Sequence, residues 1–363
     1  MFKVLTAIGL TLAMVAASPA KAQTADPRWN AHEADFTVAD FQFKTGEHLA
    51  NLRLHYTTLG TPVRDAAGRI TNAVFLLHGT GGTGQQFYRA QFSGELFGPG
   101  QLLDTARYFI ILPDDIGHGR SSKPSDGLHM RFPKYGYADM VALEHALVTD
   151  GLHVGRLKLI LGTSMGCMHA FVWGETYPDA AEALAPFACL PSALVGRNRL
   201  WREMVVDAIQ SDPAWKGGDY TAEPPDGLRA AAYMLSIAGS APAQMQKSLP
   251  TQAAIDKYRQ DLVTNEMVTV DADDLIYQLN ASKDYDPSAN LERITTKVLW
   301  INSADDFINP PDLGIAERQA RRIRGARFVL LPARADGHGH GTHTWAAFWQ
   351  DELGALMKRS GGD

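Results

Sequence analysis

The feature that most constrains the fold is a series of short apolar runs separated by helix-like stretches, such as residues 137–150 and 165–177. Runs rich in Val, Ile, Leu and Phe are typical of parallel strands buried on both faces. Strands that alternate with helices predict an α/β fold with a mostly parallel, doubly wound sheet and helices on both faces. Residues 41–43 and 52–56 alternate in polarity and predict an antiparallel hairpin at a sheet edge. The five apolar runs are residues 73–77, 108–112, 157–161, 297–301 and 327–331.

One long stretch interrupts this alternation of strands and helices. Between residues 191 and 286 the strand pattern stops, and residues 198–209 and 252–263 have the periodicity of helices instead. We therefore expect a helical lid, residues 191–286, inserted into a single core domain. The two parts of that core are residues 23–190 and 287–363.

The first 22 residues have the composition of a secretory signal peptide. Lys3 supplies a positive charge, residues 4–17 are mostly apolar, and Ala20-Lys21-Ala22 is a small-x-small cleavage site. The apolar run of about fourteen residues is shorter than the roughly twenty that span a bilayer. We expect cleavage after Ala22 and a mature protein that is periplasmic or secreted and has no membrane partner.

The charge and the cysteine content limit the classes of partner that we expect and bear on the redox state of the thiols. The chain has 34 Lys and Arg against 40 Asp and Glu, with no long basic run, so nucleic acid is not an expected partner. An oxidising compartment would permit Cys167 and Cys189 to pair. Because both lie in apolar segments, we expect buried free thiols and leave pairing open.

Residues 162–166, Gly-Thr-Ser-Met-Gly, follow the apolar run 157–161 and begin a helix-like stretch. This is the context of a nucleophile elbow, the tight turn of α/β-hydrolases that lifts a serine Oγ clear of the sheet. Glycines are needed on both sides because side chains there would collide with neighbouring backbone. The pattern predicts Ser164 as a nucleophile.

A nucleophilic serine of this kind needs donors for the oxyanion that forms on the attacked carbonyl group. The loop His-Gly-Thr-Gly-Gly, residues 78–82, leaves the end of the run 73–77. In this fold such a loop points a backbone N–H toward the serine, and the residue after the nucleophile supplies a second. The predicted oxyanion hole is formed by Thr80 and Met165.

An acid and a base are expected after the last two strands. Asp306 begins the pattern Asp, any residue, apolar residue, any residue, Pro, whereas the adjacent Asp305 does not and fits a helix cap. Beyond the last run, His338, His340 and His343 lie in one loop. The order serine, acid, histidine favours Ser164, Asp306 and His340 as the triad, with the other two histidines as alternatives. A different interpretation makes the three histidines a zinc site.

Several segments carry a more specific resemblance than the elbow alone: residues 96–100, 103–110, 132–133, 139–141 and 162–168. With these the chain resembles the homoserine O-acetyltransferase-like branch of the α/β-hydrolase fold superfamily, from about residue 72 to the end. The resemblance implies that Ser164 accepts an acyl group and that Asp306 and His340 complete the triad.

Three features depart from that branch. The expected export separates the chain from a cytosolic amino-acid pathway. The loop 114–120 is similar to that of general hydrolases rather than to the Gly/Ser/Thr-rich loop of the transferases. The histidine motif lacks the aspartate that follows the histidine in the transferases.

These observations predict a serine hydrolase that cleaves an ester or similar acyl substrate through an acyl-enzyme on Ser164. The alternative is an O-acyltransferase that passes the acyl group to an alcohol, because one triad can serve both reactions. The expected partner is a small-molecule acyl substrate, with no organic cofactor and no metal. Assembly as a homodimer is left open.

Overall fold

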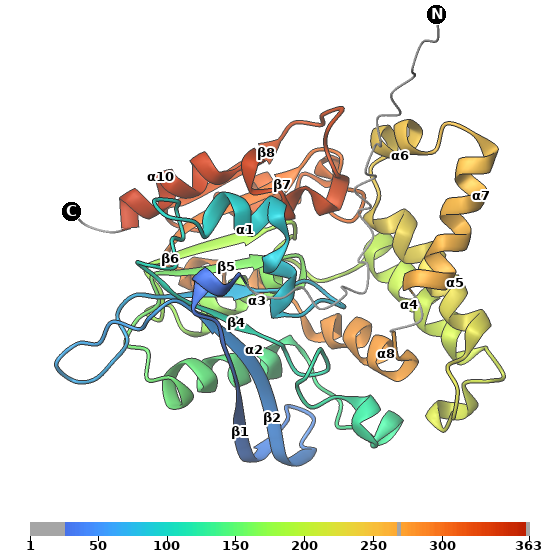
Figure 1. Cartoon of the computed structure of the whole chain (residues 1–363), viewed down its shortest axis with the longest axis horizontal. Helices are drawn as coiled ribbons and strands as arrows, with labels where there is room; N and C mark the ends of the chain where they lie inside the picture. Colours follow the sequence, from blue (N-terminus) through green and yellow to red (C-terminus); the bar gives the residue numbers. More distant parts are fainter. Residues whose placement is uncertain (1–25, 267–269, 361–363) are drawn as a thin grey trace, which may run out of the picture.

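The core of the protein is an eight-stranded sheet, seen in the computed structural model of residues 26–266 and 270–360 (Figure 1). The signal peptide predicted for residues 1–22 lies outside the described residues. The strands follow the order β1-β2-β4-β3-β5-β6-β7-β8. They are β1 (His32–Gln42), β2 (His48–Leu59), β3 (Ala73–Leu77), β4 (Phe109–Pro113), β5 (Leu159–Thr163), β6 (Ala183–Phe187), β7 (Lys297–Ser303) and β8 (Ala326–Leu331).

The directions of the strands confirm the predicted mostly parallel sheet. β1 pairs antiparallel with β2 and β2 antiparallel with β4, whereas the pairs from β4 to β8 are all parallel. The strands β3, β4, β5 and β6 are buried along their whole length, as their apolar sequences require. The sequence did not predict β6, because its residues are alanine-rich and include Pro186, which is unfavourable within a sheet.

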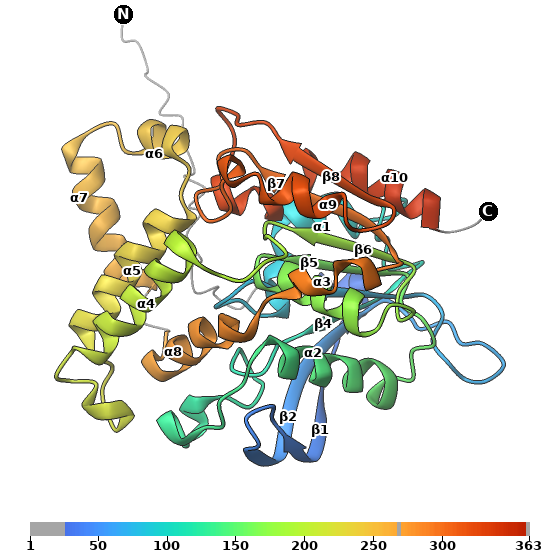
Figure 2. The same cartoon turned by 180° about the vertical axis from the view of Figure 1, so that it is seen from behind.

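Helices cover both faces of the sheet (Figures 1 and 2). One hydrophobic cluster joins one face to α2, α3 and α9, and a second joins the opposite face to α1 and α10. The last helix, α10, begins at Gln350, and two short 3-10 turns, Gly339–Thr344 and Ala346–Phe348, precede it. The helices are α1 (Ala90–Leu96), α2 (Tyr137–Ala146), α3 (Met165–Thr176), α9 (Ile315–Ala320) and α10 (Gln350–Ser360).

A group of helices, here called the cap, connects β6 to β7 and lies to one side of the sheet (Figure 1). Val205, Ile209, Leu228 and Ile276 belong to a hydrophobic cluster separate from those of the core. No helix among residues 26–266 and 270–360 has the length and apolar character needed to cross a membrane. The cap helices are α4 (Gly196–Gln210), α5 (Pro225–Gly239), α6 (Pro242–Ser248), α7 (Gln252–Asp261) and α8 (Ala272–Asn280).

A disulfide joins Cys167 in α3 to Cys189 just beyond β6, with 5.8 Å between the two Cα atoms. The prediction of free thiols is wrong. Thr163 at the end of β5 pairs with Phe187 at the end of β6, so the chain segments that leave these two strands lie side by side. This neighbourhood brings the two sulfur atoms together, and it could not be foreseen without β6.

Candidate active site

Ser164 occupies a strained turn between β5 and α3. Its backbone φ of 55° and ψ of −106° are unusual for a residue with a side chain. A Cβ on Gly162 would lie 1.9 Å from the Gly166 carbonyl oxygen, and a Cβ on Gly166 would lie 2.3 Å from that of Leu77. The glycines are therefore required by the crowding that the sequence pattern implied.

The structure brings Ser164, His340 and Asp306 into one chain of hydrogen bonds. His340 Nε2 is 2.8 Å from Ser164 Oγ, and His340 Nδ1 is 2.9 Å from Asp306 Oδ2. Ser164 is presented by the end of β5, Asp306 by the loop after β7, and His340 by the 3-10 turn η13 (Gly339–Thr344). A neutral imidazole with a donor at Nδ1 and an acceptor at Nε2 can take the serine proton.

Asp306 is held in its ionised form by several donors. The backbone N–H groups of Ile308 and Asn309 donate to Oδ1 at 2.8 and 3.1 Å, and Asn309 Nδ2 donates to Oδ2 at 3.0 Å. Burial raises the pKa of Asp306, but the nearby His340 and the hydrogen bonds from His340 and Asn309 outweigh it, so the pKa is lowered. The adjacent Asp305 instead accepts a hydrogen bond from the Gly339 N–H at 3.2 Å.

The other two histidines of the loop point to different partners. His338 Nδ1 is 3.2 Å from Gln244 Nε2, and its ring stacks on Trp345 at 4.0 Å between centroids. His343 Nδ1 bonds to the carbonyl oxygen of His340, and burial lowers the pKa of His343 to about 3. The three imidazoles do not converge on one point, so this geometry gives no support to the zinc interpretation.

The two predicted oxyanion donors belong to the loop after β3 and to the first residue of α3. The Gly166 N–H donates to the His78 carbonyl oxygen at 2.9 Å, which fixes the loop before Thr80 against the start of α3. A Cβ on Gly79 would be 3.3 Å from Ser164 Cβ, so this loop approaches the serine closely. Within the described chain, the N–H groups of Thr80 and Met165 donate no hydrogen bond. They are available to an oxygen bound next to Ser164.

A second polar cluster lies fully buried within the core and was not predicted from the sequence. Glu144 Oε1 is 2.7 Å from His169 Nδ1, and Trp173 Nε1 donates to Glu144 Oε2 at 2.5 Å. Asp115 Oδ2 lies 3.7 Å from His169 Nδ1. Burial and the proximity of the two carboxyl groups raise the pKa of Asp115, and burial raises that of Glu144. Among the described residues these three side chains have the spacing of metal ligands, but each is sealed from solvent.

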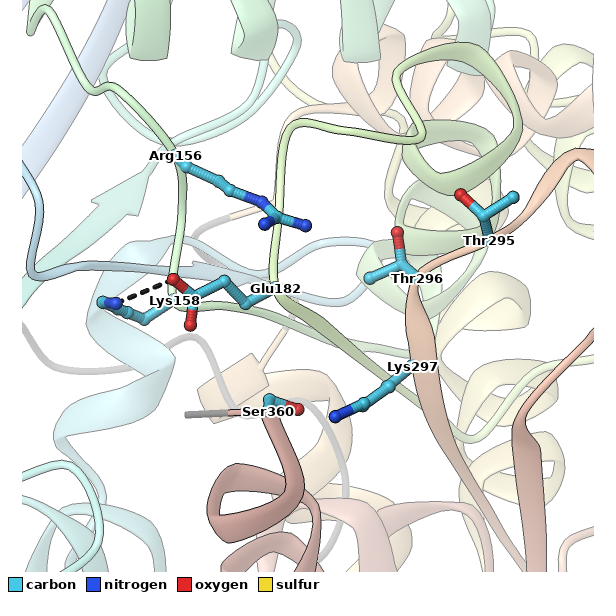
Figure 3. Close-up of a pocket in the computed structure, with 7 residues that line it drawn as sticks. All are labelled: Arg156, Lys158, Glu182, Thr295, Thr296, Lys297 and Ser360. Atoms are coloured by element: carbon cyan, nitrogen blue, oxygen red, sulfur yellow. Dashed lines mark hydrogen bonds and ion pairs between the residues drawn. The ribbon is translucent and has the colours of Figure 1, made fainter. Parts of the chain in front are cut away.

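A cavity of about 410 Å³ lies at the opposite end of the strands (Figure 3). It is lined by Lys158, which directly precedes β5, and by Lys297, the first residue of β7, and Lys158 Nζ is 2.7 Å from Glu182 Oε1. Ser164 stands instead where β5 ends. The cavity in Figure 3 is therefore not part of the candidate active site.

Comparisons with known proteins agree with this fold. Residues 72–335 match a family model described as the alpha/beta hydrolase fold. The chain is 28% identical to a homoserine O-acetyltransferase of Thermobifida fusca, over 81% of this chain and 86% of that protein. A solved homoserine O-acetyltransferase of Bacillus anthracis superposes with a TM-score of 0.79 at 21% identity, covering 91% of this chain and 98% of that one. An acetylester hydrolase of Corynebacterium glutamicum gives 0.78 at 20% identity, covering 90% and 96%.

The chain belongs to the alpha/beta hydrolase fold family and is an enzyme of that family. The sequence resemblance to its homoserine O-acetyltransferase-like branch is confirmed by the relatives found. Because both a transferase and a hydrolase share the fold, the family alone leaves acyl transfer and ester hydrolysis as alternatives.

Proposed function

We propose that this enzyme hydrolyses carboxylic esters through an acyl-enzyme on Ser164. The observation that carries the proposal is the hydrogen-bonded chain from Ser164 Oγ through His340 to Asp306. In this arrangement the histidine acts as general base and then as general acid, and the carboxylate fixes its tautomer.

The first half of the reaction forms the acyl-enzyme. His340 Nε2 takes the hydroxyl proton while Ser164 Oγ bonds to the carbonyl carbon, and the carbonyl electron pair moves onto the oxygen. The N–H groups of Thr80 and Met165 stabilise that oxyanion, and one such donor contributes about 3–4 kcal/mol. When the tetrahedral species collapses, the bond to the alcohol breaks and His340 returns the proton to the leaving oxygen.

The second half releases the acid. A water molecule gives a proton to His340 and bonds to the acyl carbon, and collapse frees the carboxylic acid with the proton returned to Ser164 Oγ. An alcohol in the place of water would give a new ester instead, which makes O-acyl transfer the second candidate. The relatives named homoserine O-acetyltransferases favour this alternative. It requires a cap that holds an alcohol at His340 better than water, since a positioned acceptor gains effective molarity.

One experiment distinguishes the two candidates. Purified protein is offered short acyl esters and acetyl-CoA, with and without homoserine, and both free acid and acylated product are followed by mass spectrometry. Hydrolysis predicts free acid at a rate that does not depend on the acceptor. Acylated homoserine in excess of free acid at millimolar acceptor would make transfer the better assignment.

We also propose that the protein is exported. The apolar run and Ala20-Lys21-Ala22 in the sequence are the basis, and the disulfide between Cys167 and Cys189 supports it, because such bonds persist in oxidising compartments. Mass spectrometry of the mature protein should find Gln23 as the first residue. A chain that retains Met1 in the cytosolic fraction would contradict export.

A further inference from the structure

Arg202 of α4 is a buried cation without a counter-ion. The residue is only 3% exposed, its Nε donates to Asn198 Oδ1 at 3.0 Å, and its guanidinium lies 4.6 Å from the centroid of the Trp201 ring. Its Nη1 is buried and has no hydrogen-bond partner among the residues that the structure describes. No carboxylate among the residues that the structure describes forms an ion pair with Arg202.

The neighbours of Arg202 are polar, and the nearby Glu203 lies 3.5 Å from Arg199 rather than pairing with Arg202. One turn earlier on α4, Arg199 Nη2 donates to Ser282 Oγ at 3.2 Å. Tyr137, at the start of α2, has a buried hydroxyl that makes no well-formed hydrogen bond within residues 26–266 and 270–360. Burial raises the pKa of Tyr137, and the positive charge of Arg202 opposes that shift, so the two side chains interact. We call Arg199, Arg202, Tyr137 and Ser282 the arginine cluster.

The arginine cluster adjoins the candidate active site. The Thr80 side chain also acts on the Tyr137 hydroxyl and lowers its pKa, and the Thr80 N–H is a predicted oxyanion donor. At the start of α4, Arg197 Nη2 donates to the carbonyl oxygen of Phe307, the residue after Asp306. The helix that carries Arg202 is therefore anchored beside the acid of the triad, and Tyr137 interacts with both Arg202 and Thr80 of the oxyanion loop.

Burying a charged group without a partner is strongly unfavourable, and proteins normally avoid it by pairing. A guanidinium presents its donors in a planar fork that fits both oxygens of a carboxylate. We infer that Arg202 binds a carboxylate of the substrate, so that the enzyme acts on esters that carry a free carboxylate rather than on neutral esters. This inference rests on the acyl-enzyme function proposed above and specifies its substrate class.

The test compares substrates that differ only in this charge. One pair is 4-acetoxybutyrate and its primary amide, with the charge on the alcohol side of the ester. The other is monoethyl glutarate and its amide, with the charge on the acyl side. The native enzyme should have a higher kcat/KM, by about tenfold or more, for the anionic member of at least one pair, as one charge-assisted hydrogen bond predicts. Equal rates, or a preference for the amide, in both pairs would overturn the inference without any variant.

Variants then assign the preference to Arg202. Arg202→Gln should lower kcat/KM for the preferred anion about 10–100-fold, mainly through KM, and change the matching amide less than about threefold. Arg202→Lys should restore part of the loss. Arg229→Gln, which removes an exposed arginine elsewhere in the cap, is the matched control and should leave both substrates unchanged. Equal losses on anion and amide would mean that Arg202 is structural.

The failure of this inference can be told apart from that of the proposed function. A neutral fluorophosphonate should label Ser164 equally fast in the native enzyme and in Arg202→Gln, whatever the substrate charge. If the folded native enzyme is not labelled, the result contradicts the proposed acyl-enzyme function. Glutarate binding to Ser164→Ala, measured by calorimetry and compared with Ser164→Ala/Arg202→Gln, then tests Arg202 by itself, and equal binding would overturn the inference.

Discussion

Two carboxylate–histidine pairs in this protein have nearly the same local geometry and different surroundings. Asp306 and His340 approach to 2.9 Å and Glu144 and His169 to 2.7 Å, in both cases through Nδ1 of the ring. His340 Nε2 faces the Ser164 hydroxyl, whereas His169 Nε2 is buried with no hydrogen-bond partner in the described chain. The geometry of the pair alone therefore does not identify a catalytic site.

The donors around each carboxylate explain their opposite pKa shifts. Asp306 accepts backbone N–H groups and the Asn309 amide, which stabilise its negative charge. Burial raises the pKa of Glu144, and its hydrogen bonds with the Trp173 indole and the Asp115 carboxyl group lower it by less than burial raises it. The pKa is lowered for Asp306 and raised for Glu144. The first pair can stabilise an imidazolium, and the second retains a proton as part of the core.

The largest effect is expected when Ser164, or the histidine of the pair that faces it, is replaced. Ser164→Ala and His340→Ala should each lower kcat by about 10⁴–10⁶-fold, and the double variant should lose little more, because triad members act as a unit. Steady-state kinetics with circular dichroism as a folding check measures this. His338→Ala and His343→Ala serve as controls and should be milder. Substantial turnover by Ser164→Ala would show that Ser164 is not the nucleophile.

The next effect compares the two carboxylates directly. Asp306→Asn should lower kcat by about 10⁴-fold, because the amide favours the wrong histidine tautomer. Glu144→Gln keeps the size and neutral state of a protonated glutamate, so kcat should change by less than about threefold. Kinetics on both variants at neutral pH gives the contrast. Similar losses in both would mean that the buried pair contributes to the chemistry.

Removing the disulfide tests how firmly α3 is held, the helix that follows Ser164 and contains His169. Replacing both Cys167 and Cys189 with alanine removes a cross-link between positions 22 residues apart, for which chain entropy predicts about 3 kcal/mol of lost stability. Urea denaturation of the oxidised native protein and the double variant measures this difference. An unchanged midpoint would show that core packing fixes α3 without the bond.

The last predicted effect is a pH dependence of stability. Because the pKa of Glu144 is higher in the folded than in the unfolded protein, the folded state keeps a proton that the unfolded chain releases above about pH 4. This contribution to the free energy of unfolding is full below that pH and is lost as pH rises, by at most about 1.4 kcal/mol per pH unit. From about pH 5 to about pH 7.5 the urea midpoint should fall less for Glu144→Gln than for the native protein. An equal fall would contradict the raised pKa.

The sequence predicted the parts of the fold that depend on local patterns. The apolar runs located β3, β4, β5, β7 and β8 to within two residues, because each of these strands contains a continuous apolar stretch that is visible in the sequence. β6 was missed because its alanines and Pro186 carry no strand preference.

The same limit applies to the site. Ser164, Asp306 and His340 stand in recognisable local motifs, and the structure places them together. Arg202 and Glu144 lie within ordinary helical patterns, and nothing in the sequence tells whether a charged residue on a helix faces solvent or the interior. Pairing of the two cysteines likewise depended on the neighbouring ends of β5 and β6.

The position of the cap in the strand order has a consequence for how such enzymes diversify. The chain leaves the sheet after β6 and returns at β7, and these two strands are hydrogen-bonded neighbours. The cap can therefore be lengthened, shortened or exchanged as one module without reordering the sheet or moving the elbow that holds Ser164. A grafted cap from a relative would change the groups that meet the substrate, Arg202 among them, and leave the chemical machinery in its inherited place.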